Sequence, residues 1–528
     1  MIRRPLTVLL AAATAGLTVA LTASIGALPA TAAGYFPISG TGSTWSQNAL
    51  DQWRSNVAKN YAMTINYTGA GSTSGRRDFI DGTVDFAISE IPFQARPEDG
   101  SAPEKPAHGY AYMPIVAGGT SFMYNLKISG KRVTNLRLSG DTITRMFTGA
   151  ITNWNDAAVQ ADNPALAMPN KKIVPVIRSD GSGTTAQFTL WMSTQYPSIW
   201  RTGMTSQFPS FGNSKAQKGS DGVAGYVSQG YGEGAITYVE YSYAKKAGFP
   251  VAKVLNKSGY YIEPTAYSVA VALSNAKINT DTSSTSYLTQ ILDGVYNSTD
   301  KRAYPLSSYS YAIVPTEVAG IFNTNKGNTL AAFMRYVLCE GQQQADTLGY
   351  SPLPMNLVLA GSDQIKRIPG SGGKGVDTAK CNNPTFKSGD SPSKNQLAII
   401  APQPAACDKK GTSQCSTGTA GATQTTPVTG TGTGGTSSGA PGTTGTTGTT
   451  SGTTSGTTGT PQYDENGNVV TGSTGSGEVA TSTPFSLPDQ GMGSSQWLMV
   501  ASALLLVAAV VVPPLLSRRL RTGAGDAS

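Results

Sequence analysis

A tract dominated by Thr, Gly and Ser near the C-terminus limits how much of this chain can form a globular core. It runs from about Gly411 to Thr483 and contains stretches such as GTTGTTGTTSGTTSGTTGT. Such a composition buries too little apolar surface to offset the entropy of ordering the backbone. We therefore assign residues 411–496 to a flexible low-complexity linker, with an end-to-end distance on the order of 50 Å for the tract. The folded part is expected to lie before it.

The N-terminus has the pattern of an export signal. Two arginines, Arg3 and Arg4, precede an apolar run over residues 6–28, and small alanines follow at positions 30, 32 and 33. This order of charged, apolar and small residues predicts a signal peptide over residues 1–33. No cysteine lies in this region, so a lipid-modified cysteine cannot anchor the mature chain here.

The C-terminus supplies a candidate membrane anchor. Residues 497–516 are almost wholly apolar and would extend roughly 30 Å as a helix, which is enough to cross a bilayer. Arginines at 518, 519 and 521 place residues 517–528 in the cytoplasm by the positive-inside rule. We expect an exported protein at the extracellular face of the membrane. The alternative is sorting to the cell wall, because LPDQG (Leu487–Gly491) partly resembles a sortase motif, although Gln490 replaces the threonine that is cut.

Charge and cysteine usage exclude some classes of function. The net charge is +8, but without the terminal segments the chain has 34 basic and 30 acidic residues, so no nucleic-acid partner is indicated. The four cysteines form an even set in an exported chain, which favours disulfides over a metal site. Three pairings are possible. We favour Cys407 with Cys415, a short local loop, and Cys339 with Cys381, which would tie a cysteine-containing extension (362–410) to the globular part.

Residues 34–361 alternate strand-like and helix-like patterns. Four runs are rich in β-branched and aromatic residues and predict strands: 84–93, 110–125, 171–179 and 234–241. Trp45, Ala49, Trp53, Val57 and Tyr61 recur every fourth position and predict one helical face. Alternation over some 300 residues predicts an α/β domain of two lobes.

One short stretch has the features of an anion site. IRSDGSGTTAQF (Ile177–Phe188) places a strand end, a small polar loop and a helix start in succession. The free N–H groups of a helix start attract anions, Ser182 or Thr184 can cap the helix, and Arg178 can pair with two oxygens. A single loop of this kind is weak evidence, because capping serines and loop glycines are common.

The pattern recurs in two other places. SGTGSTWSQNAL (Ser39–Leu50) has Ser43 and Thr44 before a helix, and YTGAGSTSGRRDF (Tyr67–Phe79) has Ser72 and Thr73 before another. If the fold brings the three loops together, their N–H and hydroxyl groups form a nest of donors. Three independent capped helices are the alternative.

With these loops and strands, the chain resembles a known family, the phosphate-binding protein of the bacterial phosphate ABC transporter (Pst type). The resemblance covers most of residues 34–354 and rests on GTGSTW, GAGSTSG, VDFAISE, LSGDTITRMFTGAITNWND, IRSDGSGTTAQF, GAITYVEYSYA and YPLSSYSYAIV, in that order. It implies a two-lobed type II periplasmic-binding-protein fold that closes on one dehydrated phosphate in the cleft between the lobes, with no cofactor. It also implies delivery to an ABC permease.

The resemblance also implies the ligands of the phosphate. The matching positions are Thr44, Trp45 through its backbone N–H, Ser72, Glu90, Arg178, Ser182, Gly183 and Thr184, with Asp180 orienting Arg178. Two of these depart from the family pattern, which has phenylalanine at position 45 and aspartate at position 90. We expect Glu90 to keep the role of the aspartate. The alternative is that Glu90 turns away from the cleft.

Other functions find less support in the sequence. A Ser-His-Asp hydrolase would have to use the one histidine, His108, which lies in the proline-rich stretch EKPAHGY. No catalytic residues and no metal ligands are assigned, and no nucleophile elbow, Walker A loop or zinc-protease motif occurs. The second hypothesis is a stalked surface protein that keeps the binding fold for display, adhesion or sensing.

Overall fold

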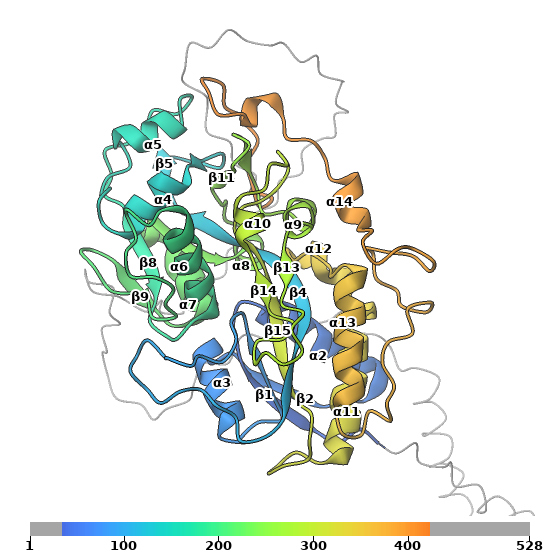
Figure 1. Cartoon of the computed structure of the whole chain (residues 1–528). Coiled ribbons are helices and arrows are strands. Elements are labelled where there is room, and N and C mark those ends of the chain that lie inside the picture. Colours follow the sequence, from blue (N-terminus) through green and yellow to red (C-terminus); the bar gives the residue numbers. More distant parts are fainter. Residues whose placement is uncertain (1–33, 423–528) are drawn as a thin grey trace, which may run out of the picture. The chain divides into compact units, whose positions relative to one another are not determined.

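The structure, a computed structural model, describes residues 34–422, and the four predicted strands are present in it (Figure 1). They are β3 (Phe86–Ser89), β4 (Tyr110–Tyr124), β8 (Val174–Arg178) and β10 (Ala235–Glu240). The helix predicted from the four-residue spacing is α2 (Gln47–Tyr61), which buries Ala49, Trp53 and Val57. Trp45 precedes this helix and is buried, whereas Tyr61 at its last position is 46 % exposed.

One long strand connects the two lobes. The main sheet has the order β2-β1-β3-β15-β4-β10-β8-β9. Its other strands are β1 (Ile38–Gly42), β2 (Ile65–Thr68), β9 (Lys215–Gln217) and β15 (Ser307–Pro315). Strand β4 pairs with β15 over residues 110–119 and with β10 over residues 120–124. Lobe 1 is therefore built on β1, β2, β3 and β15, and lobe 2 on β8, β9 and β10.

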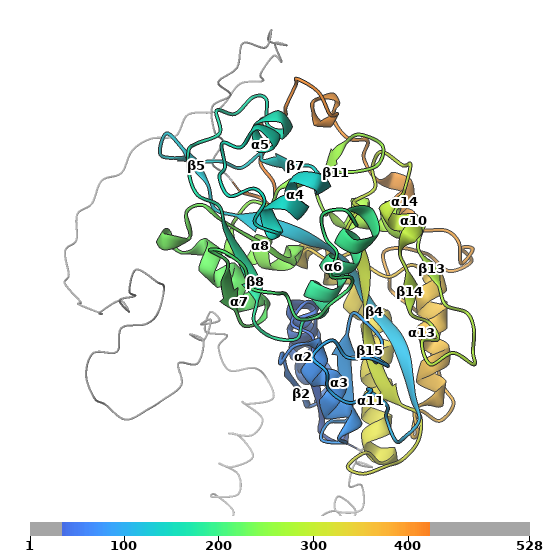
Figure 2. The same ribbon diagram turned by 60° about the vertical axis from the view of Figure 1, so that its left-hand side comes forward.

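Helices lie around each half of the sheet, as Figures 1 and 2 show. Lobe 1 carries α2, α3 (Ser72–Ile80), α11 (Thr324–Leu338), α12 (Ala345–Leu348) and α13 (Met355–Arg367). Lobe 2 carries α4 (Gly140–Phe147), α5 (Ala157–Asp162), α6 (Gly183–Gln195), α7 (Gly219–Ser228) and α8 (Tyr241–Ala247). The predicted two-lobed α/β fold is confirmed.

Smaller elements complete the lobes and the connection back to β15. In lobe 2 these are β5 (Lys127–Ile128), β6 (Lys131–Arg132), β7 (Arg137–Leu138), β11 (Lys253–Leu255) and β12 (Tyr261–Ile262). The returning segment contains α9 (Ala266–Leu273), β13 (Lys277–Ile278), β14 (Gln290–Ile291) and α10 (Asp293–Tyr296). The main hydrophobic cluster includes residues of both lobes, among them Trp53, Val116 and Phe188.

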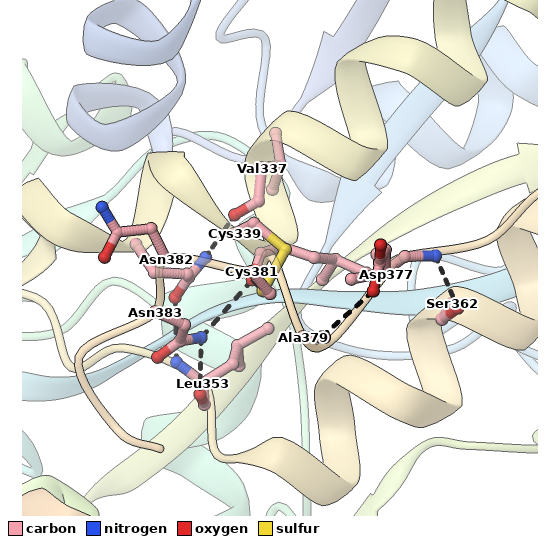
Figure 3. The surroundings of a disulfide bond; sticks show 12 residues. Val337, Cys339, Leu353, Ser362, Asp377, Ala379, Cys381, Asn382 and Asn383 are labelled. Atoms are coloured by element: carbon pink, nitrogen blue, oxygen red, sulfur yellow. Dashed lines mark hydrogen bonds between the residues drawn. A yellow bond between two sulfur atoms is a disulfide. The ribbon is translucent and has the colours of Figure 1, made fainter. Parts of the chain in front are cut away.

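The cysteine-containing extension begins on lobe 1. The boundary expected at residue 361 falls inside α13, so the extension continues a helix that packs on β4 and α11. A disulfide joins Cys339, at the end of α11, to Cys381 (Figure 3). Beside it, Asn383 Nδ2 donates to the carbonyl oxygen of Leu353 at 3.1 Å. The predicted pairing of these cysteines is confirmed.

The extension ends on lobe 2. Helix α14 (Gln396–Ile400) packs on α9, and the second predicted disulfide, Cys407–Cys415, follows. The buried guanidinium of Arg137 donates to the carbonyl oxygens of Cys407 at 3.1 Å and Ser413 at 2.7 Å. Residues 411–422, which the sequence analysis placed in the linker, also pack on the fold, since Thr419 Oγ1 donates to the Val251 carbonyl at 2.6 Å. Folded structure thus continues beyond residue 410.

Four predicted segments lie outside the described residues. These are the signal peptide (1–33), the linker from residue 423 to 496, the apolar span at 497–516 and the cytoplasmic tail (517–528). Among residues 34–422, the helices are too short or too polar to cross a bilayer.

We expect the Cys339–Cys381 disulfide to stabilise the fold more than Cys407–Cys415. The cysteines of this disulfide are 42 positions apart in the sequence, whereas Cys407 and Cys415 are 8 positions apart. Loop-closure entropy then corresponds to about 4 kcal/mol for the first and about 2.5 kcal/mol for the second. Urea unfolding of the two Cys→Ser double variants, each serving as the control for the other, measures the difference. Equal losses of unfolding free energy, or a larger loss without Cys407–Cys415, would contradict the expectation.

Candidate functional site

The three Gly/Ser/Thr loops meet between the lobes. The first follows β1, the second lies between β2 and α3, and the third lies between β8 and α6. Gly71 N–H donates to the Gly42 carbonyl oxygen at 2.8 Å, which joins the first two loops. Thr73 N–H donates to the Gly181 carbonyl oxygen at 3.1 Å, which joins the second loop to the third. The alternative of three separate capped helices is therefore excluded by the geometry.

The first loop contributes Thr44 and Trp45. Thr44 Oγ1 lies 2.9 Å from Ser220 Oγ of lobe 2. The N–H of Trp45, the predicted ligand donor, lies 2.9 Å from Ser43 Oγ, and its ring is buried edge-on against Tyr350. Helix α2 begins at Gln47, two residues after Trp45. A contact between the Trp45 N–H and a ligand stays a prediction.

The second loop contributes Ser72, which contacts Glu90. Ser72 Oγ donates to Glu90 Oε2 at 2.8 Å and accepts the N–H of Gly183 at 3.1 Å. The other carboxylate oxygen of Glu90 accepts from Ser310 Oγ at 2.9 Å. A Cβ at position 183 would overlap Glu90 Oε2, so only glycine fits there. Glu90 therefore points into the space between the loops and reaches the start of α6, instead of turning away.

Burial governs the ionisation of Glu90. Its side chain is 1 % exposed, and loss of hydration raises the pKa of the carboxyl above its usual value. The hydroxyls of Ser43, Ser72 and Ser310 and the charge of Arg178 act in the opposite direction. On balance the ionised form is destabilised, so the Glu90 carboxyl holds a proton more readily in the fold than it would in water.

The third loop contributes a buried ion pair. Arg178 Nε donates to Asp180 Oδ1 at 2.7 Å, and its NH2 nitrogen donates to Asp180 Oδ2. The Arg178 charge lowers the pKa of Asp180 despite the burial of that carboxyl. The predicted orienting contact is thus present. Its role in holding a ligand stays a prediction.

The start of α6 supplies further hydrogen-bonding groups. Ser182 is the N-cap, and its Oγ accepts the N–H of Thr185 at 3.2 Å. Thr184 Oγ1 is buried and has no hydrogen-bond partner within residues 34–422. This hydroxyl is free to donate to an anion at the helix start. The predicted set Ser182, Gly183 and Thr184 therefore lies beside Ser72 and Glu90.

Several residues that were not predicted from the sequence lie beside the predicted ones. Ser220 at the start of α7 contacts Thr44, and Tyr243 OH of α8 donates to the Thr44 carbonyl. Ser310, on β15, contacts Glu90. The stretch KGSDG (Lys218–Gly222) carries the same glycine and serine signal as the other loops, in a shorter form. The serines of β15 gave no such signal, because they lie within a buried strand.

The two arginines after Ser72 lie in different environments. Arg76 is buried and pairs with Glu104, with 2.7 Å between Nε and Oε2. Its charge is neutralised inside lobe 1. Arg77 has a 42 % exposed side chain and pairs with Asp99. Only Arg77 is therefore at the surface. The one histidine, His108, is also exposed and lies 3.5 Å from Glu317.

The charges of the site do not favour an anion by themselves. Arg178 contributes one positive charge, while Asp180 and an ionised Glu90 contribute two negative ones. Attraction must therefore come from N–H and hydroxyl donors. An anion that carries a proton can donate a hydrogen bond to the Glu90 carboxylate. A fully deprotonated anion would instead place its own lone pairs against those of the carboxylate. The arrangement suits a protonated oxyanion.

Comparison with known proteins gives related sequences over the two-lobed part. Residues 27–341 match the model of the PBP superfamily domain. The phosphate-binding protein PstS of Xylella fastidiosa (strain Temecula1) is 32 % identical over 325 residues, which are 61 % of this chain and 82 % of the relative. That of Haemophilus influenzae is 30 % identical over 332 residues, 62 % of this chain and 92 % of the relative.

A solved structure of a high-affinity periplasmic phosphate-binding protein with bound phosphate is also similar. It shares 18 % identity and covers 61 % of this chain and 92 % of its own, with a TM-score of 0.48.

Glu90→Gln is expected to raise the thermal midpoint of the ligand-free protein near pH 7.5. The raised pKa means that the ionised carboxylate costs stability in the fold. This cost disappears as the pH falls through the raised pKa, because the wild-type side chain becomes neutral. The difference between variant and wild type should therefore shrink on acidification. Thermal unfolding from pH 8 to pH 5 measures it, and a difference that grows at low pH would contradict the reasoning.

Proposed function

The chain belongs to the PBP superfamily, and within it to the family of PstS phosphate-binding proteins, and we propose that its two lobes capture inorganic phosphate outside the cytoplasm. Family membership confirms the prediction of a binding protein and not an enzyme. The observation that carries the proposal is the meeting of three loops, each rich in N–H and hydroxyl donors, around Arg178 and Glu90. Phosphate is then the ligand of Thr44, Trp45, Ser72, Glu90, Arg178, Ser182, Gly183 and Thr184.

The protonation of the ligand supports phosphate over sulfate. Near neutral pH phosphate still carries a proton, which can be donated to Glu90, and sulfate carries none. A buried carboxylate that accepts this proton therefore selects phosphate through the penalty of two facing acceptors. Ser72 and Ser310 hold both oxygens of Glu90 in place for this contact.

Delivery to an ABC permease is the most direct use of the captured phosphate. Residues 423–496 would act as a spacer, and the apolar residues 497–516 would hold the protein at the outer face of the membrane, with residues 517–528 in the cytoplasm. The alternative is a stalked display, adhesion or sensing protein. The curated relatives, named as phosphate-binding proteins, do not favour it.

Isothermal titration with phosphate and sulfate tests the proposal. We expect one-to-one phosphate binding of micromolar or tighter affinity, and weaker sulfate binding. Glu90→Gln should reduce the preference for phosphate by roughly tenfold or more, because it replaces a charged acceptor with a neutral amide. Glu90→Asp, the matched control, should retain the preference. A preference for sulfate would contradict the phosphate assignment. If the protein binds neither oxyanion, the result favours the alternative of a stalked display, adhesion or sensing protein.

Arg178→Ala should weaken phosphate binding much more than Arg77→Ala. Arg178 is buried and can donate charge-assisted hydrogen bonds, so its loss should cost roughly 100-fold in affinity. Arg77 is exposed, and its loss should cost no more than about fivefold. Titration of both variants, with thermal unfolding to verify their folds, measures the ratio. Similar losses would show that the third loop does not bind the ligand.

Deleting residues 497–528 should release a folded protein that still binds phosphate. The deletion removes only the apolar segment and the tail, and the two-lobed part ends well before them. Cell fractionation and phosphate titration of the shortened chain measure both properties. A full-length protein that is found free in the medium would contradict the proposed anchor.

A further inference from the structure

A fourth loop enters the site from lobe 2 at Ser220. Strand β9 ends at Gln217, and α7 begins at Gly219, which has a positive φ of 70°. Gly219 N–H donates to Asp180 Oδ1 at 2.9 Å, so the loop is fixed to the Arg178–Asp180 pair. Ser220 is fully buried and lies between Thr44 of lobe 1 and Arg178 of lobe 2. Its position makes it a direct connection between two predicted ligand residues.

The guanidinium of Arg178 determines the orientation of the Ser220 hydroxyl. Asp180 occupies the Nε and NH2 nitrogens, and NH1 donates to Ser220 Oγ at 3.4 Å. A serine oxygen that accepts from a cation directs its own proton elsewhere. The neighbouring acceptor is Thr44 Oγ1, 2.9 Å away.

Thr44 then accepts twice from the same residue. Its Oγ1 accepts the Ser220 backbone N–H at 3.1 Å, and it also accepts the Ser220 hydroxyl when that proton is directed along the 2.9 Å contact, as the Arg178 contact favours. A hydroxyl oxygen has two lone pairs and one proton. With both lone pairs used, the Thr44 hydroxyl acts as a donor. An anion in the site is an acceptor, so this orientation suits it.

We propose that Ser220 is a positioning residue for phosphate binding, which orients the Thr44 hydroxyl as a donor toward the anion and holds Arg178 NH1 in place. The inference rests on the proposed phosphate function. Because Thr44 belongs to lobe 1 while Ser220 and Arg178 belong to lobe 2, the chain of hydrogen bonds exists only when the lobes are closed. Ser220 therefore stabilises the closed, ligand-bound form, and its loss increases the rate of phosphate release.

The test measures phosphate affinity and release in five variants of the full chain, one of them a control. Ser220→Ala removes the hydroxyl, and Ser220→Thr retains it. Thr44→Val, alone and combined with Ser220→Ala, completes a double-mutant cycle. Ser228→Ala is the matched control, because this serine lies at the other end of α7 and its Oγ donates to the Gly225 carbonyl of the same helix. Isothermal titration gives the affinity for inorganic phosphate, and stopped-flow displacement gives the release rate.

Ser220→Ala should weaken phosphate binding by about tenfold, mainly through faster release. Ser220→Thr should restore most of the affinity, and Ser228→Ala should not change it. In the Thr44→Val background, Ser220→Ala should cost less than about threefold, because the group that it orients is already absent. A purely structural role would lower the thermal midpoint without this coupling.

Two outcomes separate the possible failures. If the wild-type protein binds phosphate and Ser220→Ala binds it equally well, the proposed role of Ser220 is wrong. Additive losses in the double-mutant cycle would have the same meaning. In both cases the proposed phosphate function stands. A wild-type protein that binds no phosphate overturns the proposed function, and with it this inference.

Discussion

The buried ion pair of Arg178 and Asp180 is the interaction on which the arrangement of the site depends. Asp180 holds the guanidinium by two hydrogen bonds and also accepts the N–H of Gly219, so one carboxylate fixes β8 and the start of α7 together. A side chain at position 71 would collide with Asp180 Oδ2, so the second loop approaches the pair closely only because residue 71 is glycine. Breaking a pair this deeply buried would leave an uncompensated charge between the lobes.

The second constraint is the excess of negative charge where the three loops meet. Glu90 reaches from lobe 1 to the start of α6, and its carboxylate is held by hydroxyls in place of a cation. Glycine at position 183 leaves room for the Glu90 carboxylate, because a Cβ there would overlap Oε2. With one arginine against two carboxylates, the proposed site would have to bind an anion through aligned donors. Such donors distinguish oxyanions by protonation state, whereas a positive field attracts every anion alike.

The C-terminal extension adds a connection between the lobes that does not belong to the sheet. One disulfide ties it to α11 on lobe 1, and Arg137 and Thr419 tie its end to lobe 2. Between these points α14 packs on α9, with Leu397 buried against Ala266 and Ala270. The fold therefore does not end where the resemblance to the family ends, near residue 354, but includes about 70 further residues that cover both lobes.

The sequence by itself determined four strands of the main sheet, helix α2 and the chemistry of the three loops. β-branched and aromatic runs identified β3, β4, β8 and β10, because strand preference is encoded in adjacent residues. Capping serines and glycines identified the helix starts for the same local reason. Of the three possible disulfide pairings, the one that the spacing favoured is present.

Only the tertiary structure decided which groups meet. Thr44 and Ser220 are separated by 176 positions, and Ser310 and Glu90 by 220, so no local pattern connects them. The burial of Arg76 depends on Glu104, which a loop brings to it from 28 positions away. The end of the folded part was likewise misjudged, because residues 411–422 have a linker's composition and pack through contacts with distant residues such as Thr134, Arg137 and Val251. Hydrogen bonds between remote residues depend on how the sheet places them, and this placement is a property of the whole fold.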